Sequence, residues 1–318
     1  MTYRELRNEG RAVLRAADVP DSDYDADVLL QEAAGLDAGS LFMKLSEEVS
    51  EGLTDKYRNM ITERASRKPL QHIVGTAWFM GLPFSVCSDV LCPRQDTEVL
   101  VEAVLAEVGQ SPKAGQSLQA GQGQSSLGDL PQEKRLQSDE TAKRDVASSS
   151  KLLDLCTGSG CLAVSLAHLG SFERVVATDL SEAALAVARK NAAMNGCSID
   201  FRQGDLFGPI GEGERFDIVV CNPPYIPSGE LKDLMPEVRD HEPALALDGG
   251  EDGLGFYKRL ARDMDRFLVP GGAFFLECGA GQSSEVIALL KAAGSYEGFR
   301  VIYDLAGHDR VVTGRRKA

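Results

Sequence analysis

Asn222, Pro223, Pro224 and Tyr225 form the segment of this chain whose residue types and spacing best suit chemistry. They directly follow the apolar run 216–221, which predicts a buried parallel strand that the two prolines end abruptly. The Asn222 side-chain carbonyl can accept a hydrogen bond, and so can the backbone carbonyl just before a proline. Two fixed acceptors can hold a planar NH2 group with its nitrogen face free to attack, while Tyr225 offers a ring for stacking. The segment therefore predicts group transfer to an amide or amino nitrogen, the competing interpretation being a plain Pro-Pro turn with a capping Asn.

A glycine-containing turn upstream predicts the site of the group donor. It consists of Cys156, Thr157, Gly158, Ser159 and Gly160. The turn lies between an expected strand at 151–155 and an expected helix at 161–169. In such a strand-turn-helix, missing Cβ atoms let a ligand approach the backbone at a helix N-terminus. The five residues of the turn are therefore candidate cofactor-binding residues.

Two further strand ends add polar residues to this site. A second strand, 174–178, is followed by Asp179, about 20 residues after the glycines, where an acid can accept both ribose hydroxyls. Asp179 with Ser181 also fits a plain helix N-cap, because a helical stretch follows at 182–195. A third strand, 199–203, leads to Asp205 and Leu206, which could flank an adenine or form an ordinary turn. A dehydrogenase would share the turn and the acid, but it would have no need of Asn222 and its neighbours.

Taken together, these motifs resemble those of class I S-adenosylmethionine-dependent methyltransferases, and specifically the release-factor glutamine methyltransferases of the HemK family. The resemblance spans both ends of the chain and rests on the segments 67–75, 84–98, 154–160, 222–225, 242–245 and 249–254. The Asn-Pro-Pro-Tyr segment alone is shared with adenine and guanine amino-methylases. Its joint occurrence with Pro-Leu-Gln-His-Ile and Pro-Arg-x-x-Thr-Glu is much more specific to the family.

The resemblance implies roles for the candidate residues. It makes 156–160 and Asp179 the methionine and ribose contacts, Leu206 an adenine-side neighbour, and 222–225 the clamp for a glutamine side chain. The implied cofactor is S-adenosylmethionine, and the implied substrate is the glutamine of the Gly-Gly-Gln motif in class I peptide-chain release factors. Two positions depart from the family pattern. Cys156 stands where glycine is common, and its side chain disfavours a positive φ and the closest backbone approach there. Leu206 stands where an aromatic residue is frequent, so the resemblance does not imply stacking on adenine.

Composition limits the class of protein. The 318 residues exceed the usual single-domain size, and a net charge of −14 opposes general attraction to nucleic-acid phosphates. Seven scattered cysteines without a C-x-x-C pair indicate neither a disulfide framework nor a metal site. The start of the chain lacks the apolar core of a signal peptide, and no apolar run is long enough to cross a bilayer. We therefore expect a cytoplasmic, metal-free, monomeric enzyme with no membrane and no direct nucleic-acid contact.

The expected elements divide the chain into four parts. Residues 1–74 predict a helical bundle whose core includes Leu6, Val13 and Leu14, and which the resemblance assigns to substrate docking. Residues 75–108 predict a hairpin, turning at 81–83, and a connecting helix from about 96 to 108. Residues 109–150, rich in Gln, Ser, Gly and Lys, predict a disordered insertion.

The last part, 151–318, carries the candidate site. After the three strands and 216–221, a turn at 268–272 should lead into a strand at 273–277, a helix near 283–292 and a final hairpin from 300–303 and 310–313. The fold class is thus α/β, a Rossmann-like methyltransferase domain with a seven-stranded mixed sheet, preceded by the helices and the hairpin. His241, Glu242 and Asp248, which follow the Asn-Pro-Pro-Tyr segment, are expected to serve as loop ligands or caps rather than as a catalytic base. A ribosomal-protein glutamine methylase, a nucleic-acid amino-methylase and a non-catalytic donor-binding adaptor remain as alternatives.

Overall fold

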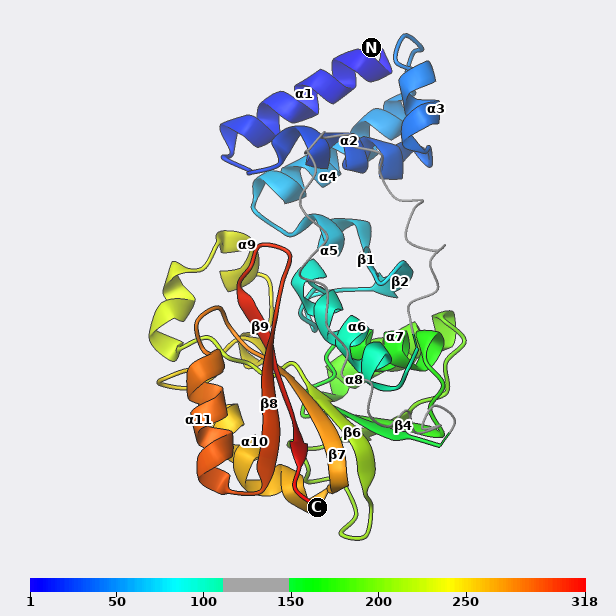
Figure 1. Ribbon diagram of the computed structural model, residues 1–318. Helices are drawn as coiled ribbons and strands as arrows, with labels where there is room; N and C mark the ends of the chain where they lie inside the picture. Colours follow the sequence, from blue (N-terminus) through cyan, green and yellow to red (C-terminus); the bar gives the residue numbers. More distant parts are fainter. Residues whose placement is uncertain (111–148) are drawn as a thin grey trace, which may run out of the picture.

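The computed structural model describes residues 1–110 and 149–318 (Figure 1). The predicted insertion, 109–150, lies almost wholly outside the described residues. None of the helices in the described ranges is long and apolar enough to cross a membrane.

Five helices open the chain and pack into a bundle of their own (Figure 1). They are α1 Tyr3–Ala16, α2 Ser22–Ala34, α3 Ala38–Met43, α4 Glu51–Ala65 and α5 Leu70–Val74. Leu6 and Leu14 are buried in the bundle core as predicted, but Val13 is 42% exposed, so that prediction was wrong. The buried stripe of α1 runs through Leu6, Gly10 and Leu14, because the Tyr57 hydroxyl of α4 occupies the space where a Gly10 side chain would stand. That contact leaves Val13 at the edge of the interface.

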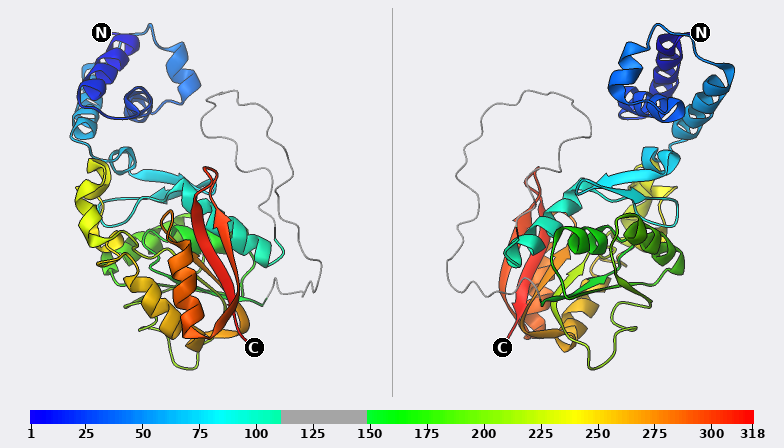
Figure 2. Two further views of the ribbon diagram at one scale, coloured as in Figure 1. Left: turned by 60° about the vertical axis from the view of Figure 1, so that its left-hand side comes forward. Right: turned by 90° about the vertical axis from the view of Figure 1, so that its right-hand side faces the viewer.

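A short hairpin connects the bundle to the rest of the chain (Figure 2). Its strands are β1 Thr76–Phe79 and β2 Leu82–Ser85, which pair antiparallel. The turn is Met80-Gly81 rather than the predicted 81–83, with φ of +51° and +74°. Two residues of positive φ match the right-handed twist of a tight hairpin, so Leu82 pairs with Phe79 and belongs to the strand. A single 3-10 turn, η1 Gln95–Thr97, and helix α6 Glu98–Glu107 follow.

The predicted seven-stranded mixed sheet is confirmed, in the order β5-β4-β3-β6-β7-β9-β8. The strands are β3 Lys151–Leu155, β4 Arg174–Asp179, β5 Asp200–Gln203, β6 Phe216–Cys221, β7 Leu268–Glu277, β8 Tyr296–Tyr303 and β9 Asp309–Arg316. The five strands from β5 to β7 run parallel, and β9 and β8 complete the sheet as an antiparallel hairpin. Residues 268–272 were predicted as a turn, but they form the first half of β7. The register between β6 and β7 shifts between Phe216 and Ile218, and the extra residues of β7 at this bulge include Gly271, whose φ is +77°.

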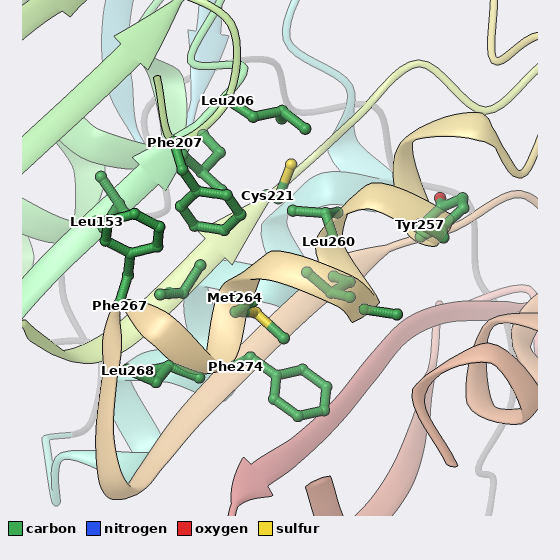
Figure 3. Packing of buried hydrophobic residues seen from close by; sticks show 14 of the residues in the cluster. Leu153, Leu206, Phe207, Cys221, Tyr257, Leu260, Met264, Phe267, Leu268 and Phe274 are labelled. Carbon is green, nitrogen blue, oxygen red and sulfur yellow. The ribbon is translucent and has the colours of Figure 1, made fainter. Parts of the chain in front are cut away.

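Helices cover both faces of the sheet. They are α6, already described, together with α7 Cys161–Leu169, α8 Glu182–Met194, α10 Gly255–Asp263 and α11 Ser283–Ala293. The short helix α9 Pro236–Arg239 and the 3-10 turns η2 Ser228–Asp233, η3 Ala244–Ala246 and η4 Met264–Arg266 lie between β6 and β7. Alternate residues of β6 enter the two cores: Val219 and Cys221 pack on the α10–α11 side, and Ile218 and Val220 on the α6–α7 side. On the α10 side the rings of Phe207 and Phe267 stack with centroids 4.8 Å apart (Figure 3). This two-sided burial fixes the central strands and hence the sheet edge at which they end.

Candidate active site

The candidate site lies at the carboxyl edge of the sheet where the strand order reverses. After β3 the chain adds β4 and β5 on one side, and β6 and β7 on the other. The connections therefore leave a crevice between the ends of β3 and β6, the usual ligand position in open α/β sheets. A cavity at this edge is lined by turn residues after β3, by Asp179 after β4 and by Asn222 after β6.

The turn after β3 is held by hydrogen bonds to its neighbours. The N–H of Thr157 donates to the Thr178 carbonyl (3.0 Å), and its hydroxyl donates to Asp154 Oδ2 (2.6 Å). Burial raises the pKa of Asp154 to about 7, against the lowering effect of Thr157. Cys156 has φ +58°, contrary to the expectation from its side chain. The hydrogen bonds of Thr157 hold the backbone there and offset the roughly 1–2 kcal/mol that a Cβ costs in this region.

The two glycines of the turn serve different purposes. Gly158 has φ +54°, and a Cβ built on it would meet no atom within 4 Å, so the backbone is open beside it. At Gly160 a Cβ would lie 3.0 Å from the Cβ of Ala188, so its absence lets α7 approach α8. Gly160 has no side chain that could cap α7, and the N–H of Ala163 faces the Asp154 carboxylate, so Cys161 and Leu162, which line the cavity, are the first-turn residues placed to meet a ligand carboxylate.

Asp179 faces this turn from the end of β4. Its Oδ2 accepts from Gly158 N–H (2.8 Å) and its Oδ1 from Ser181 N–H (2.9 Å). Burial raises its pKa, while the N–H groups of Ser181 and Gly158 lower it. The helix cap of α8 is Ser181, whose hydroxyl accepts from Ala184 N–H (3.1 Å). Each carboxylate oxygen of Asp179 keeps a further lone pair, so bracing the turn is compatible with accepting ribose hydroxyls.

The expected adenine end of the cavity has both an apolar and a charged part. Leu206 has φ +49° and packs into the core beside Phe207, so only 5% of it is exposed. Asp205 accepts from Arg259 Nη2 (2.7 Å), which ties the turn after β5 to α10. Sequence reasoning missed Leu180 and Phe256, which also line the cavity. The available sequence signal for the first of them was its position, directly after Asp179 and between two polar residues.

The Asn-Pro-Pro-Tyr segment lies opposite, at the end of β6. Asn222 and Pro224 line the cavity. Tyr225 packs beside the α10–α11 core instead, and its carbonyl accepts from Gln282 Nε2 (3.0 Å). A Cβ at Gly249 would lie 2.8 Å from Tyr225 Cα, and one at Gly253 would lie 2.4 Å from its carbonyl oxygen. Gly249 and Gly253 therefore allow close packing against Tyr225, whereas Gly250 has φ +91° and open space where a Cβ would stand.

The structure brings most of the predicted site residues together. Those lining the one cavity are Cys156, Thr157, Gly158, Ser159, Asp179, Asp205, Leu206, Asn222 and Pro224. Gly160, Pro223 and Tyr225 are not among the lining residues.

A loop before α6 also borders the cavity, and sequence reasoning gave it no role. It contributes residues 89–94 and Thr97, and the facing loop contributes Pro243, Leu245 and Ala246. Glu242, with a side chain 1% exposed, joins the two loops by accepting from Arg94 Nη2 (2.6 Å) and Cys92 N–H (3.2 Å). The motifs Pro-Arg-x-x-Thr-Glu and Glu-Pro-Ala-Leu were visible in the sequence, but only the fold shows that they meet. The loop-cap expectation is confirmed for Glu242 and for Asp248, which accepts from Ser228 Oγ (2.6 Å) and Gly250 N–H (2.9 Å).

His72, Cys92 and Glu242 form a cluster in which potential metal-ligand atoms lie within 4.8 Å of one another. Arg94 already engages the Glu242 carboxylate. Burial lowers the pKa of His72, and the positive charges of His241, Lys68 and Arg94 lower it further. Because the same positive field opposes a bound cation, the absence of a metal stays our prediction for this cluster.

Comparison with known proteins identifies the family. A family model for the PrmC N-terminal domain matches residues 5–75, and one for the methyltransferase small domain matches residues 140–237. The release factor glutamine methyltransferase of Geobacter sulfurreducens is 35% identical, covering 99% of this chain and 96% of that protein. That of Moorella thermoacetica is 37% identical, covering 100% and 99%. The chain belongs to the release factor glutamine methyltransferase family.

A solved structure of similar name was also found. The protein-(glutamine-N5) methyltransferase (release factor-specific) of Alicyclobacillus acidocaldarius is 26% identical, with a TM-score of 0.38 over 74% of this chain and all of that chain. As a member of the family the present chain is a methyltransferase, and its methyl donor is S-adenosylmethionine. The residues described above fit that donor: the first turn of α7 suits its carboxylate, Asp179 its ribose, and the end of the cavity at Leu206 its adenine.

Proposed function

We propose that this chain methylates the side-chain amide nitrogen of the glutamine in the Gly-Gly-Gln motif of class I peptide-chain release factors, giving N5-methylglutamine. The observation that carries the proposal is the position of Asn222 and Pro224, which line the donor cavity at the end of β6. An amide is a weak nucleophile, and a site for it must hold both hydrogens and leave the nitrogen face directed at the donor. The nearly full-length similarity to named release factor glutamine methyltransferases supports glutamine as the target.

The chain's own residues would mainly align the substrate. Bound S-adenosylmethionine supplies a methyl group activated by its sulfonium centre. The Asn222 side-chain oxygen and the Pro223 carbonyl, which precedes Pro224, would each accept one hydrogen of the glutamine NH2. Drawing charge toward these fixed acceptors favours attack by the nitrogen. The glutamine nitrogen would take the methyl group while the electron pair of the broken S–C bond stays on sulfur, which leaves as the neutral thioether, and the methylated amide would then lose one proton to water.

The remaining parts of the chain have proposed roles around this step. Residues 156–160, Asp179, Asp205 and Leu206 would hold the donor, and the loop at 89–94, which borders the cavity, would limit the access of water. The helical part, 1–74, would dock the release factor, and Tyr225 would support the clamp from behind. We further propose that the enzyme is a cytoplasmic monomer and does not bind nucleic acid directly, in keeping with its net charge of −14.

The test is methyl transfer from labelled S-adenosylmethionine to a purified release factor, read by mass spectrometry of the Gly-Gly-Gln peptide. Asn222→Ala should lower turnover at least about a hundredfold while donor affinity stays within several-fold, as expected for a contact at the reacting centre. A release factor with Ala in place of the target Gln is the matched substrate control. Near-normal turnover by the variant would remove Asn222 from the mechanism, and transfer to ribosomal protein or nucleic acid instead would refute the proposed substrate.

A further inference from the structure

Glu277 is a buried carboxyl group next to the clamp that the proposed mechanism does not use. It ends β7, the strand beside β6, and it is 2% exposed. Cys221 pairs with Leu276, so Asn222 and Glu277 each follow the last paired residues of two adjacent parallel strands. The register alone places the two side chains at the same point of the sheet edge.

The backbone of Glu277 is held from three sides. The Glu277 carbonyl accepts from the Tyr257 hydroxyl of α10 (2.6 Å), and Glu277 pairs with Val311 of β9. The N–H of the next residue, Cys278, donates to the Arg310 carbonyl (2.8 Å). The carboxyl group cannot move away by a shift of the strand. It must therefore be accommodated where it stands.

The side chain, by contrast, is incompletely satisfied. Within the described residues, Glu277 Oε2 has no partner at hydrogen-bond distance, and neither has the nearby Thr97 hydroxyl, which borders the cavity. Burial raises the pKa of Glu277 to about 7, while Thr97, Arg310 and Asn222 favour its ionised form. An unsatisfied buried carboxylate costs free energy. Because Glu277 Oε2 lies beside the Asn222 amide without a partner, we expect it to have a functional role there.

Asn222 presents a problem that such an acceptor solves. A carboxamide can point either its oxygen or its NH2 group toward the cavity, and only the oxygen can accept from a glutamine NH2. A carboxylate is an acceptor only, so it selects the orientation in which Nδ2 faces Glu277 and Oδ1 faces the cavity. The negative charge also polarises the amide and strengthens its oxygen as an acceptor.

We propose that Glu277 is a positioning residue of the methyl transfer, which accepts from Asn222 Nδ2 and thereby turns the Asn222 oxygen toward the substrate amide. The inference rests on the proposed function. Glu277 does not line the cavity, so it acts through Asn222 rather than on the substrate.

The charged and titratable neighbours of Glu277 come from every element packed around it. They are Asp96 of η1, Arg310 of β9, Tyr257 of α10, Cys161 of α7, and Tyr225 and Cys278 next to the strand ends. Arg310 is itself paired with Asp304 (2.9 Å), which partly neutralises its charge. Because Glu277 must be ionised to accept from Asn222, kcat should rise with pH through a limb centred near 7 and then level off.

The experiment measures kcat against pH at saturating donor and release factor for the wild type and for Glu277→Gln. The near-isosteric Gln can present its own NH2 group to Asn222, so it no longer selects one orientation. We expect kcat to fall about tenfold, the KM for the release factor and the donor Kd to stay within twofold, and the limb near 7 to disappear. Asp154→Asn removes a second buried carboxyl whose pKa is raised to about 7, and it should retain the limb.

A double variant of Glu277 and Asn222 distinguishes failure of the role assigned to Glu277 from failure of the amide clamp. If Glu277 acts through Asn222, the double variant Glu277→Gln with Asn222→Ala should be no slower than Asn222→Ala alone. Additive losses, or a Glu277→Gln variant with wild-type kcat and limb, would overturn the role assigned to Glu277. A wild-type rate for Asn222→Ala would instead refute the amide clamp. If the Gln variant does not fold, Glu277→Asp provides the test, because it keeps the charge but moves it one methylene away from Asn222. This variant should keep the pH limb and lower kcat, and a wild-type kcat would overturn the inference.

Discussion

A buried ion-pair cluster fastens the N-terminal helices to the loop that follows the clamp. Glu237 of α9 accepts from Arg67 Nε (2.6 Å) and Nη2 (2.7 Å), and from Arg64 Nη1 (3.1 Å) and Nη2 (3.0 Å). The Glu237 side chain is 12% exposed and that of Arg64 is 7% exposed. Figure 2 shows α9 lying where the helical part approaches the catalytic part. Glu237→Ala should therefore loosen the proposed docking part without touching the donor site.

The stability lost in Glu237→Ala depends on the hydrogen bonds that Arg64 and Arg67 retain. Removing one partner of a buried ion pair commonly costs about 3–5 kcal/mol, because the remaining charge is stranded. Here Arg64 Nε still donates to Asp25 (2.7 Å), and Arg67 Nη1 to the Asp18 carbonyl (3.0 Å). The loss should thus be about 2–3 kcal/mol, within the range for charged hydrogen bonds, which corresponds to a roughly 30- to 150-fold increase in local opening.

Hydrogen exchange measures that opening directly. Amides at the C-terminal end of α4 and in α9 should lose protection by this factor, while those of α7 stay unchanged. The KM for the release factor should rise and donor affinity should not. Burial opposes ionisation of Glu237, but Arg67 and Arg64 outweigh it and lower its pKa, so the contribution is full at neutral pH and is lost only in acid.

The matched control is Glu230→Ala, an exposed glutamate of the same loop. If this control and Glu237→Ala showed the same exchange rates and the same KM, the ion pairs would carry no docking energy and the reasoning would be refuted.

Two further predictions concern the donor site and the insertion. Asp179→Ala should weaken S-adenosylmethionine by about 1.5–3 kcal/mol, measured by calorimetry, without unfolding the protein; unchanged affinity would restrict Asp179 to bracing the turn at Gly158. Replacing residues 112–148 with a short Gly-Ser connector should preserve the thermal midpoint and the methylation rate, because α6 and β3 share a core through Leu105, Val108 and Leu152. A trimmed protein that binds the donor but no longer methylates the release factor would mean that the segment takes part in docking.

The sequence alone determined the elements that depend on local pattern. The run 216–221, closed by two prolines, predicted β6 with the correct bounds, and the glycine turn predicted α7 at Cys161–Leu169. Each rests on apolar periodicity and on residues that act within a few positions. Since carboxyl ends of parallel strands share one edge, the meeting of the turn, Asp179 and Asn222 at one cavity could also be predicted.

Only the tertiary structure decided which distant residues complete the site. Glu277 lies 55 positions after Asn222 and reaches it through the register of β6 and β7, while Glu242 meets Arg94 across 148 positions and Glu237 meets Arg64 across 173. No local pattern encodes such pairings, because they depend on how whole elements pack. Val13 shows the same limit in the bundle: it shares helical spacing with Leu6, but the close fit of Tyr57 against Gly10 places the buried face along Leu6, Gly10 and Leu14. Local chemistry thus fixes where the apolar strands of the central sheet form, whereas the packing of the cores fixes which side chains face one another and, as at 268–272, whether a glycine-containing segment turns or continues a strand.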